Sequence, residues 1–468
     1  MKDKNFIKKI FIYFFGNITS RLIGLILLPI YAFYTTSSEL GEFDYLISIS
    51  ALISPIIFVS IWESVLKNFL VNKNEQKEND ISTLMGFIIL VSISVLIVVI
   101  ISLILGVKYV YIMTMLFTLA SSVSIIWQYF ARGYNSTKLY VASGILSSVL
   151  NIILIIVFLI FLKLGLLGLF LAYLLSQISI IVLIEFKLRL LNKFSFSKFK
   201  FSILRSYLIF SLPLMLNMIA LWLLNGFGRI ITTNYFGSNS NGLIAFANKV
   251  TIPISMIGAV IIMALVEDAI LTIKNNTNHK ELTKKISGII DFFTFFSILL
   301  IPLISLAFFL IRKTVYFDSL IYVPILILTA TVSVMSSAVG SIFQAISKTS
   351  IQFYSTILGG AINVVSTFLM ISTLGIWAVL IGQLLGMTSI FFIRYFMISK
   401  LVHLKLNWVK YIIVVVFTSL NLIFIKNYSI THILLLFIVT IALSYIINFK
   451  TINMVYVLIK RKIFNVSN

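Results

Sequence analysis

The stretch LKLGLLGLFLAYLLSQ, residues 162–177, has a counterpart about 210 residues later in STLGIWAVLIGQLLGM, residues 372–387. Both stretches are almost wholly apolar, so the similarity lies in the kind of segment that crosses a membrane. The identical positions are Leu164 with Leu374, Gly165 with Gly375, Leu174 with Leu384, and Leu175 with Leu385. This pair decides the fold, because it indicates a duplicated membrane unit.

Two further pairs of segments keep nearly the same separation. TKLYVASGILSSVLN (137–151) aligns with TSIQFYSTILGGAIN (349–363), and both segments end in asparagine. Glu63 in SIWESVLKN falls over Glu267 in ALVEDAILT. The separation stays near 205–212 residues, so we expect spans 7–12 to duplicate spans 1–6. An even number of spans keeps both copies in one orientation, which describes parallel repeats, a common transporter plan.

Apolar residues dominate the composition. Of 468 residues 60% are apolar and only 11% are charged. Apolar stretches of about 20 residues, the length needed to cross ~30 Å of hydrocarbon, recur along the chain. Because a backbone in lipid must satisfy its own hydrogen bonds, such stretches are helices. We predict an all-α polytopic membrane protein with 14 transmembrane helices near residues 10–34, 42–66, 83–105, 109–130, 139–162, 165–186, 205–228, 243–270, 286–310, 320–346, 350–372, 375–398, 409–425 and 430–448.

The repeat and the spans together predict the domain layout. Two six-helix repeats form an N-lobe and a C-lobe, and two extra helices follow the second repeat. The expected bounds are 1–186 for the N-lobe, 187–204 for a cytoplasmic linker, 205–400 for the C-lobe, 401–448 for spans 13 and 14, and 449–468 for a basic cytoplasmic tail.

The charge is strongly positive, +22 at pH 7, and its distribution explains it. With the N-terminus inside, most of the 36 Lys and Arg residues fall in or beside cytoplasmic segments. That asymmetry is the positive-inside rule, and it places both termini in the cytoplasm. No nucleic-acid partner is implied.

Several chemistries are excluded. The chain has no cysteine, which removes thiolate metal sites, thiol catalysis and disulfides. Its three histidines lack metal-ligand spacing, and no P-loop or Ser–His–Asp pattern is present. The longest connections are too short to fold as catalytic domains. We therefore expect no enzyme activity, metal or cofactor, and a driving force from an ion gradient, the membrane potential, or product consumption.

Polar residues inside the predicted spans mark a candidate site, because an ionisable group in hydrocarbon is costly and normally faces protein or a wet cavity. In span 1, Asn17, Arg21 and Gly24 share one helix face. Arg21 lies about 16 Å along the span, near the midplane, where its side chain cannot easily reach the headgroups. It is the cation hardest to explain without an anionic ligand.

Span 7 is the counterpart of span 1. Asn217, Asn225 and Arg229 share a face there, and Lys249 lies about 10 Å into span 8. A cavity between the two halves, lined by Arg21 and these two cations, would attract an anion. Arginine suits phosphate because its planar guanidinium donates two hydrogen bonds at once.

Each assignment has a structural alternative. Arg229 and Lys249 could extend to the headgroups, and the asparagines could join helices. Arg21 could pair with a span carbonyl or with Asp44. Candidates for gating or ion coupling are the charged residues Asp44, Glu63, Lys67, Glu267 and Asp268.

Three segments resemble the bacterial polysaccharide biosynthesis protein family. RIITTNYFGSNSNGLIAFANKV (229–250) is similar to its seventh–eighth span signature, with Gly228 where an acidic residue usually precedes the arginine. LILLPIYAFYTTSSELGEFDYLIS (25–48) and WESVLKNFL (62–70) look like its first-half motifs, the latter with Lys67 for arginine. The resemblance covers roughly residues 6–400, and the missing acid suggests that Arg229 is free to bind substrate.

This resemblance implies membership of the multidrug/oligosaccharidyl-lipid/polysaccharide exporter superfamily. The implied function is a flippase that moves an undecaprenyl-diphosphate-linked oligosaccharide, for O-antigen, capsule or exopolysaccharide, to the outer leaflet by alternating access. The implied location is the bacterial inner membrane. Candidate partners are membrane lipids, H⁺ or Na⁺ as coupling ion, and glycan polymerase machinery. Alternatives are a lipid II flippase, a multidrug or cation exporter of the same superfamily, and a glycan polymerase or ligase.

Overall fold

A computed structural model describes residues 24–71, 74–274, 279–346, 348–399 and 408–425, with the isolated residues 406, 431, 438, 439 and 442. Within these residues the chain forms helices and no strand, as the composition predicts. Ten helices are long and apolar enough to cross a membrane, or eleven when the bent pair Phe227–Lys249 and Ile252–Met263 counts as one span. The protein is therefore a multi-pass membrane protein.

These eleven helices correspond in order to predicted spans 2–12. The shorter apolar helix Gly24–Tyr34 covers the end of predicted span 1, and α15 (Trp408–Ile425) covers span 13. Most of span 14 and the part of span 1 that holds Asn17 and Arg21 lie outside the described residues.

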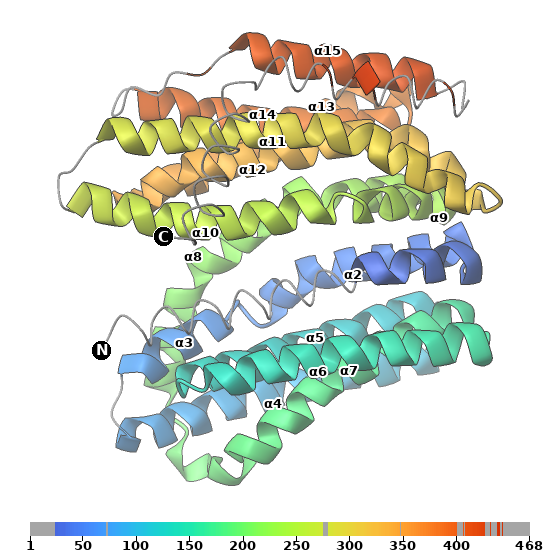
Figure 1. The fold of residues 1–468 in the computed structure, drawn as a ribbon. Helices are drawn as coiled ribbons and strands as arrows, with labels where there is room; N and C mark the ends of the chain where they lie inside the picture. The colour runs from blue at the N-terminus through green and yellow to red at the C-terminus, as the bar shows by residue number, and fades with distance from the viewer. Residues whose placement is uncertain are drawn as a thin grey trace, which may run out of the picture. The chain divides into compact units, whose positions relative to one another are not determined.

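The chain divides into two compact units, Met1–Ala245 and Phe246–Asn468 (Figure 1). In the first unit, α7 packs against α5 and α6, while α2 and α3 pack against α5 and α8. The core at the α3 end of this unit is aromatic, with the rings of Phe69 and Phe130 edge to face at 5.2 Å. The helices are α2 (Ser37–Ile57), α3 (Trp62–Val71), α4 (Asn74–Ile104), α5 (Tyr109–Gly133), α6 (Thr137–Ile155), α7 (Gly165–Leu188) and α8 (Phe201–Asn225), with the start of α9 (Phe227–Lys249).

The second unit repeats this packing. There α14 packs against α12 and α13, and α10 packs against α12, as α2 does against α5. Its helices, after the end of α9, are α10 (Ile252–Lys274), α11 (His279–Phe308), α12 (Val323–Ala345), α13 (Thr349–Leu374), α14 (Trp377–Ser399) and α15.

Two glycines confirm the duplication at the level of the backbone. Gly165, at the start of α7, has a φ of 54°, and Gly375, just before α14, has a φ of 56°. These two residues are aligned by the sequence repeat. Glycine adopts a positive φ without the Cβ clash that other residues meet. Both copies therefore have a glycine with a positive φ at the aligned position.

The segment 229–242, which the hydropathy pattern predicts as an outer loop, is instead mostly helical. α8 ends at Asn225, and α9 resumes one residue later and continues to Lys249. The chain reverses at one residue, Gly237, whose φ of 82° and ψ of 163° are not helical. A second helical segment then begins at Ser238, earlier than the predicted start of span 8 at residue 243.

Candidate functional site

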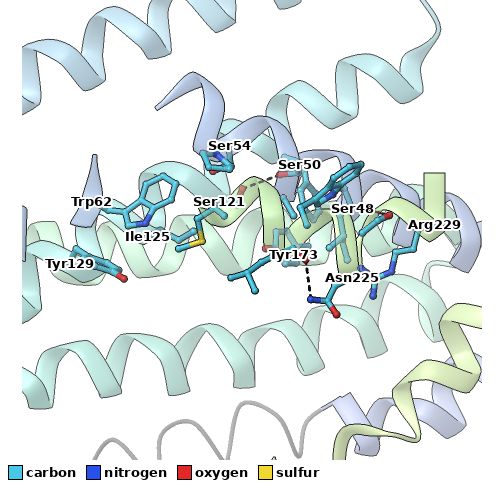
Figure 2. Close-up of a pocket in the computed structure, with 18 residues that line it drawn as sticks. Ser48, Ser50, Ser54, Trp62, Ser121, Ile125, Tyr129, Tyr173, Asn225 and Arg229 are labelled. Carbon is cyan, nitrogen blue, oxygen red and sulfur yellow. Dashed lines mark hydrogen bonds between the residues drawn. The ribbon is translucent and has the colours of Figure 1, made fainter. Parts of the chain in front are cut away.

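A cavity of about 510 Å³ lies inside the first unit. It is lined by residues of α2, α3, α5, α7, α8 and the first turn of α9. Figure 2 shows Asn225 and Arg229 at one end of this cavity, and Trp62 and Tyr129 at the other. The cavity therefore has two chemically different ends.

The α2 wall of the cavity carries hydroxyls that are used to hold helices together. Ser50 and Ser54 occur four residues apart and so lie on one helix face. Their Oγ atoms are 3.3 Å from that of Ser121 and 2.6 Å from that of Ser122, both on α5. Hydrogen bonds between hydroxyls are one of the ways in which spans associate in lipid. These serines explain why α2 and α5 form one side of the cavity.

Five aromatic side chains also line the cavity. They are Trp62 of α3, Phe117 and Tyr129 of α5, Tyr173 of α7, and Trp222 of α8. The rings of Phe117 and Tyr173 are stacked with centroids 4.0 Å apart. Stacked and buried rings offer a large, rigid and mainly apolar surface. The body of the cavity therefore suits the apolar faces of an amphipathic molecule.

The polar end of the cavity lies at the break between α8 and α9. Ser48 Oγ donates to the carbonyl of Gly226 at 2.9 Å, and Trp222 Nε1 donates to the carbonyl of Ser48 at 2.8 Å. A Cβ at position 226 would overlap the Trp222 indole, so glycine fits this break where a larger residue does not. Asn225, beside the break, donates from its side chain to the carbonyl of Leu221 at 3.1 Å.

Arg229 has an acidic partner, contrary to the expectation based on Gly228. The acid comes from α2, where Asp44 Oδ2 lies 2.9 Å from Arg229 Nε. The side chain of Arg229 keeps 28% of its surface exposed, compared with 13% for Asp44. In the described part of the chain no further side-chain hydrogen bond or ion pair of Arg229 is seen. The two Nη groups, with four of the five donors of the guanidinium, remain for a ligand.

At the opposite end of the cavity, Tyr129 is in contact with the carboxylate of Glu63. The Tyr129 hydroxyl lies 2.8 Å from Glu63 Oε1 and donates to it. The Arg132 guanidinium lies 4.9 Å from the centre of the Tyr129 ring and 5.5 Å from that of Tyr140. The gating candidate Glu63 is thus in contact with a residue that lines the cavity. Lys67 lies one turn further along α3, and its side chain is outside the described part.

The structure brings together some of the predicted site residues and not others. Arg229 and Asn225 both line the cavity, and Asp44 joins them through Arg229. Asn217 is half-buried on α8 and does not line it. Lys249, Glu267 and Asp268 belong to the second unit. In the described residues, no group of three or more metal-ligating side chains occurs.

The sequence prediction missed a buried arginine in the second unit. Arg394 of α14 is 9% exposed and makes five hydrogen bonds, to oxygens of Ser336 (two bonds), Gln352, Ser355 and Thr356. It was open to detection by the rule that singled out Arg21, since FFIRYF (391–396) places an arginine within an apolar span. The five aromatic residues that line the cavity, here called the aromatic wall, could not be singled out in the sequence, because aromatic residues are frequent throughout the chain.

No protein-family model and no curated protein matches the chain. Solved structures do. "Lipid II flippase MurJ, inward closed conformation" matches with a TM-score of 0.70 at 14% identity, over 94% of this chain and 99% of that one. An inward-facing multidrug resistance MATE transporter of the MOP superfamily matches with a TM-score of 0.56 at 17% identity, over 82% and 95%. An outward-facing MATE transporter of the same superfamily matches with a TM-score of 0.53 at 16% identity, over 84% of this chain and 96% of that one.

These similarities show the fold alone: the chain has the fold of the lipid II flippase MurJ and of the MATE transporter structures. The matched structures are described as transporters and as a flippase. The structures with this fold are known in inward-facing and outward-facing forms.

Proposed function

We propose that this protein is a flippase for a polyprenyl-diphosphate-linked oligosaccharide, the class of cargo used for O-antigen, capsule or exopolysaccharide. The observation that supports this most is the cavity in the first unit, with an arginine at one end and an aromatic body. Such a cavity is complementary to a molecule that joins an anionic group to apolar and ring-shaped parts. Because the chain has the fold of membrane transporters, this cavity is the natural place for a cargo.

In this proposal the Arg229 guanidinium binds the diphosphate. Two parallel N–H···O bonds from its Nη groups fit two phosphate oxygens, while the ion pair with Asp44 is at Nε and leaves both Nη groups to the cargo. Arg21 and Lys249 are proposed as further cations, and Asn17, Asn217 and Asn225 as neutral ligands. Sugar rings would stack on the aromatic wall, since apolar sugar faces pack well against rings. The two repeats then rock to expose the cargo on the opposite leaflet.

The sign of the cavity's charge argues against a cationic drug as cargo. Among the described residues that line it, none is acidic and Arg229 carries a positive charge. A carrier of cations needs a carboxylate in that position to compensate the cargo's charge. The acid nearest to this end, Asp44, is already paired with Arg229.

A lipid II flippase is the second candidate, because the match to the lipid II flippase MurJ extends over nearly the whole of both chains. The fold does not separate the two cargoes. We place the protein in the bacterial inner membrane with both termini cytoplasmic, and we keep H⁺ and Na⁺ as candidate coupling ions. Glu63, in contact with Tyr129, is the carboxylate best placed to link coupling to the cavity. Glycan polymerase machinery is the expected partner on the outer side.

Deletion of the gene tests the function directly. We expect lipid-linked glycan to accumulate on the cytoplasmic leaflet and surface polysaccharide to be lost. The chain with Arg229→Gln should fail to restore export at wild-type protein level. Arg205→Gln is the matched control, because Arg205 is an exposed residue of α8 that does not line the cavity.

The same strains separate the candidates. Rescue of a strain depleted of its lipid II flippase, with surface polysaccharide unaffected by the deletion, would favour lipid II as the cargo. Normal glycan export without this gene, and no rescue of the lipid II defect, would refute both assignments.

A further inference from the structure

The chain between α7 and α8 lies at a membrane surface. Both helices are long and apolar enough to cross a membrane, so the residues that join them lie where the chain leaves the hydrocarbon and re-enters it. We call residues 186–201 the α7–α8 segment. It contains two short 3₁₀ helices, η2 (Leu191–Lys193) and η3 (Phe196–Lys198), and belongs to the first unit. None of its residues lines the cavity, so its composition calls for another explanation.

The α7–α8 segment carries only positive charge. It has no acidic residue, and all five of its cations are exposed, namely Lys187, Arg189, Lys193, Lys198 and Lys200. Lys198 is neutralised within the protein, since its Nζ lies 2.5 Å from Glu78 Oε2 on α4. Among the described residues, the other four form no salt bridge. The segment therefore presents a net positive surface to whatever lies beside it.

Large apolar side chains alternate with these cations. Phe186, Phe196 and Phe201 keep 74%, 76% and 70% of their surface exposed, and Leu191 and Phe199 are exposed as well. Rings held in water forgo the free energy of burial. At the headgroup level of a bilayer, rings of this kind enter the apolar boundary while neighbouring Lys and Arg side chains stay among the headgroups. The alternation therefore suits a segment that lies in the plane of the interface.

The backbone of the segment is fixed on its α4 side. Ser195 donates from its backbone N–H to Ser82 Oγ at 3.2 Å, and Lys200 donates from its backbone N–H to Thr83 Oγ1 at 3.1 Å. Both hydroxyls belong to α4, which crosses the membrane. The second half of the segment is thus bound to a spanning helix by its main chain, and its side chains are left to point elsewhere.

The start of the segment is fixed by a carboxylate. Glu185, near the end of α7, accepts from the Leu191 backbone N–H at 2.9 Å and from Trp127 Nε1 of α5 at 3.1 Å. Leu190, between these anchors, is fully buried in the core of the first unit. Because the segment is held at both ends, its cations are arranged before any ligand binds, which lowers the entropic cost of binding.

The orientation of the chain does not account for these features. The positive-inside rule concerns the number of Lys and Arg residues in a connection. It requires neither exposed rings between the cations nor a backbone that is hydrogen-bonded to two helices. Both are expected of a site for lipid headgroups, because a leaflet that contains anionic phospholipids carries the complementary charge and attracts clustered Lys and Arg residues beside a span.

We propose that the α7–α8 segment is a binding site for anionic phospholipids of the surrounding leaflet. Lys187, Arg189, Lys193 and Lys200 hold the phosphate headgroups, and the exposed rings lie at the boundary with the acyl chains. This site is separate from the cavity, and the inference depends neither on the proposed cargo nor on the transport cycle.

Energy transfer to labelled lipids tests this binding. Because the chain has no cysteine, a donor dye can be attached at an exposed position of the segment through Ser197→Cys. The protein is reconstituted in phosphatidylcholine vesicles with a trace of either phosphatidylglycerol or phosphatidylcholine, each carrying the same acceptor dye on an acyl chain. We expect phosphatidylglycerol to be enriched about threefold or more around the donor, and the enrichment to fall at high salt.

A variant of the segment and a charge-matched control identify the residues responsible. The test variant keeps Lys198, whose ion pair with Glu78 helps to hold the segment, and should lose the enrichment. It carries Lys187→Gln, Arg189→Gln, Lys193→Gln and Lys200→Gln. The control variant should keep the enrichment, because it loses the same charge at exposed residues in loops that the charge distribution places on the other side of the membrane. It carries Lys108→Gln, Lys163→Gln, Arg312→Gln and Lys313→Gln.

Equal transfer to the two lipids in the wild type would overturn the site, as would enrichment that persists in the test variant. Enrichment that is insensitive to salt would overturn the role of the cations without any variant. Displacement of phosphatidylglycerol by soluble glycerol phosphate would assign the cations to a soluble anion, and displacement by a trace of polyprenyl diphosphate would assign them to the cargo; either result would overturn the proposal. Failure of glycan export in cells, with the enrichment intact, would instead refute the proposed function.

Discussion

Two arginines in apolar helices, Arg394 and Arg229, have their N–H donors satisfied in different ways. Arg394 of α14, in the second unit, is 9% exposed and donates hydrogen bonds to five neutral oxygens on two other helices, α12 and α13. Arg229 in the first unit keeps 28% of its side chain exposed and shares one nitrogen with Asp44. The first has its donors satisfied by the protein, whereas the second has donors left at a cavity wall.

The number of unsatisfied donors distinguishes a structural arginine from a ligand-binding one better than the mere presence of a charge in a span does. A guanidinium has five N–H donors, and a buried one must satisfy them all. Where the protein satisfies them, as at Arg394, the residue joins α12, α13 and α14. Where it does not, as at Arg229, the remaining donors are available to a ligand. Four substitutions test this contrast, and they are given in decreasing order of effect.

Arg394→Met should destabilise the protein most. Methionine fills much of the volume but leaves buried oxygens of Ser336, Gln352 and Thr356 without their donor, which should cost about 4 kcal/mol. Thermal unfolding of the purified protein in detergent measures this. Arg394→Lys keeps the charge but has fewer donors, so its melting temperature should lie between those of the wild type and Arg394→Met. If Arg394→Met melted at the wild-type temperature, Arg394 would have no structural role.

Arg229→Ala should have the opposite profile. Loss of two charge-assisted hydrogen bonds to a diphosphate, about 3 kcal/mol together, lowers the transport rate about 100-fold. The melting temperature should fall less than for Arg394→Met, because Arg229 is partly exposed and has one ion pair, whereas Arg394 has five hydrogen bonds. Transport in proteoliposomes and thermal unfolding, measured on the same preparation, check both. Equal transport by Arg229→Ala and wild type would contradict the assignment.

Asp44→Asn tests whether the acid competes with the cargo for Arg229. Without the carboxylate, the guanidinium keeps its full positive potential, so a polyprenyl diphosphate should bind about tenfold more tightly. A titration at low and high salt checks the change, and the gain should shrink at high salt. Weaker binding by Asp44→Asn would mean that Asp44 serves only to orient Arg229.

Thr356→Val should have the smallest effect. It removes one of the neutral acceptors around Arg394 while keeping the shape of the side chain. The expected loss is about 1 kcal/mol of stability, with no change in transport by the folded protein. A transport defect at wild-type stability would show that the Arg394 cluster takes part in the transport cycle.

Much of the fold could be predicted from the sequence. The length of an apolar run reports directly on a membrane crossing, so the eleven spans from the second to the twelfth were found in order. The duplication was visible in aligned residues such as Gly165 and Gly375, which both have a positive φ. Both features are encoded locally, and no knowledge of packing is needed to see them.

The details of the site were harder to predict. Hydropathy averages over many residues, so it could not show that the helix resumes after Gly226 or turns at Gly237 alone. The partner of Arg229 comes from another helix, so the residue beside it in sequence, Gly228, was a poor guide. Arg229 and Asn225 were identified because polar residues are conspicuous in an apolar span. The aromatic wall was not, since its residues look like ordinary core.

Selection of a diphosphate-bearing cargo by Arg229 can be measured in a transport assay with two matched lipids. Purified protein in proteoliposomes is given a fluorescent polyprenyl-diphosphate oligosaccharide or the same oligosaccharide on a polyprenol without phosphate. We predict that only the diphosphate lipid moves between leaflets, about 100-fold faster than in vesicles with Arg229→Ala. Equal rates for the two lipids, or equal rates with and without Arg229, would contradict the account.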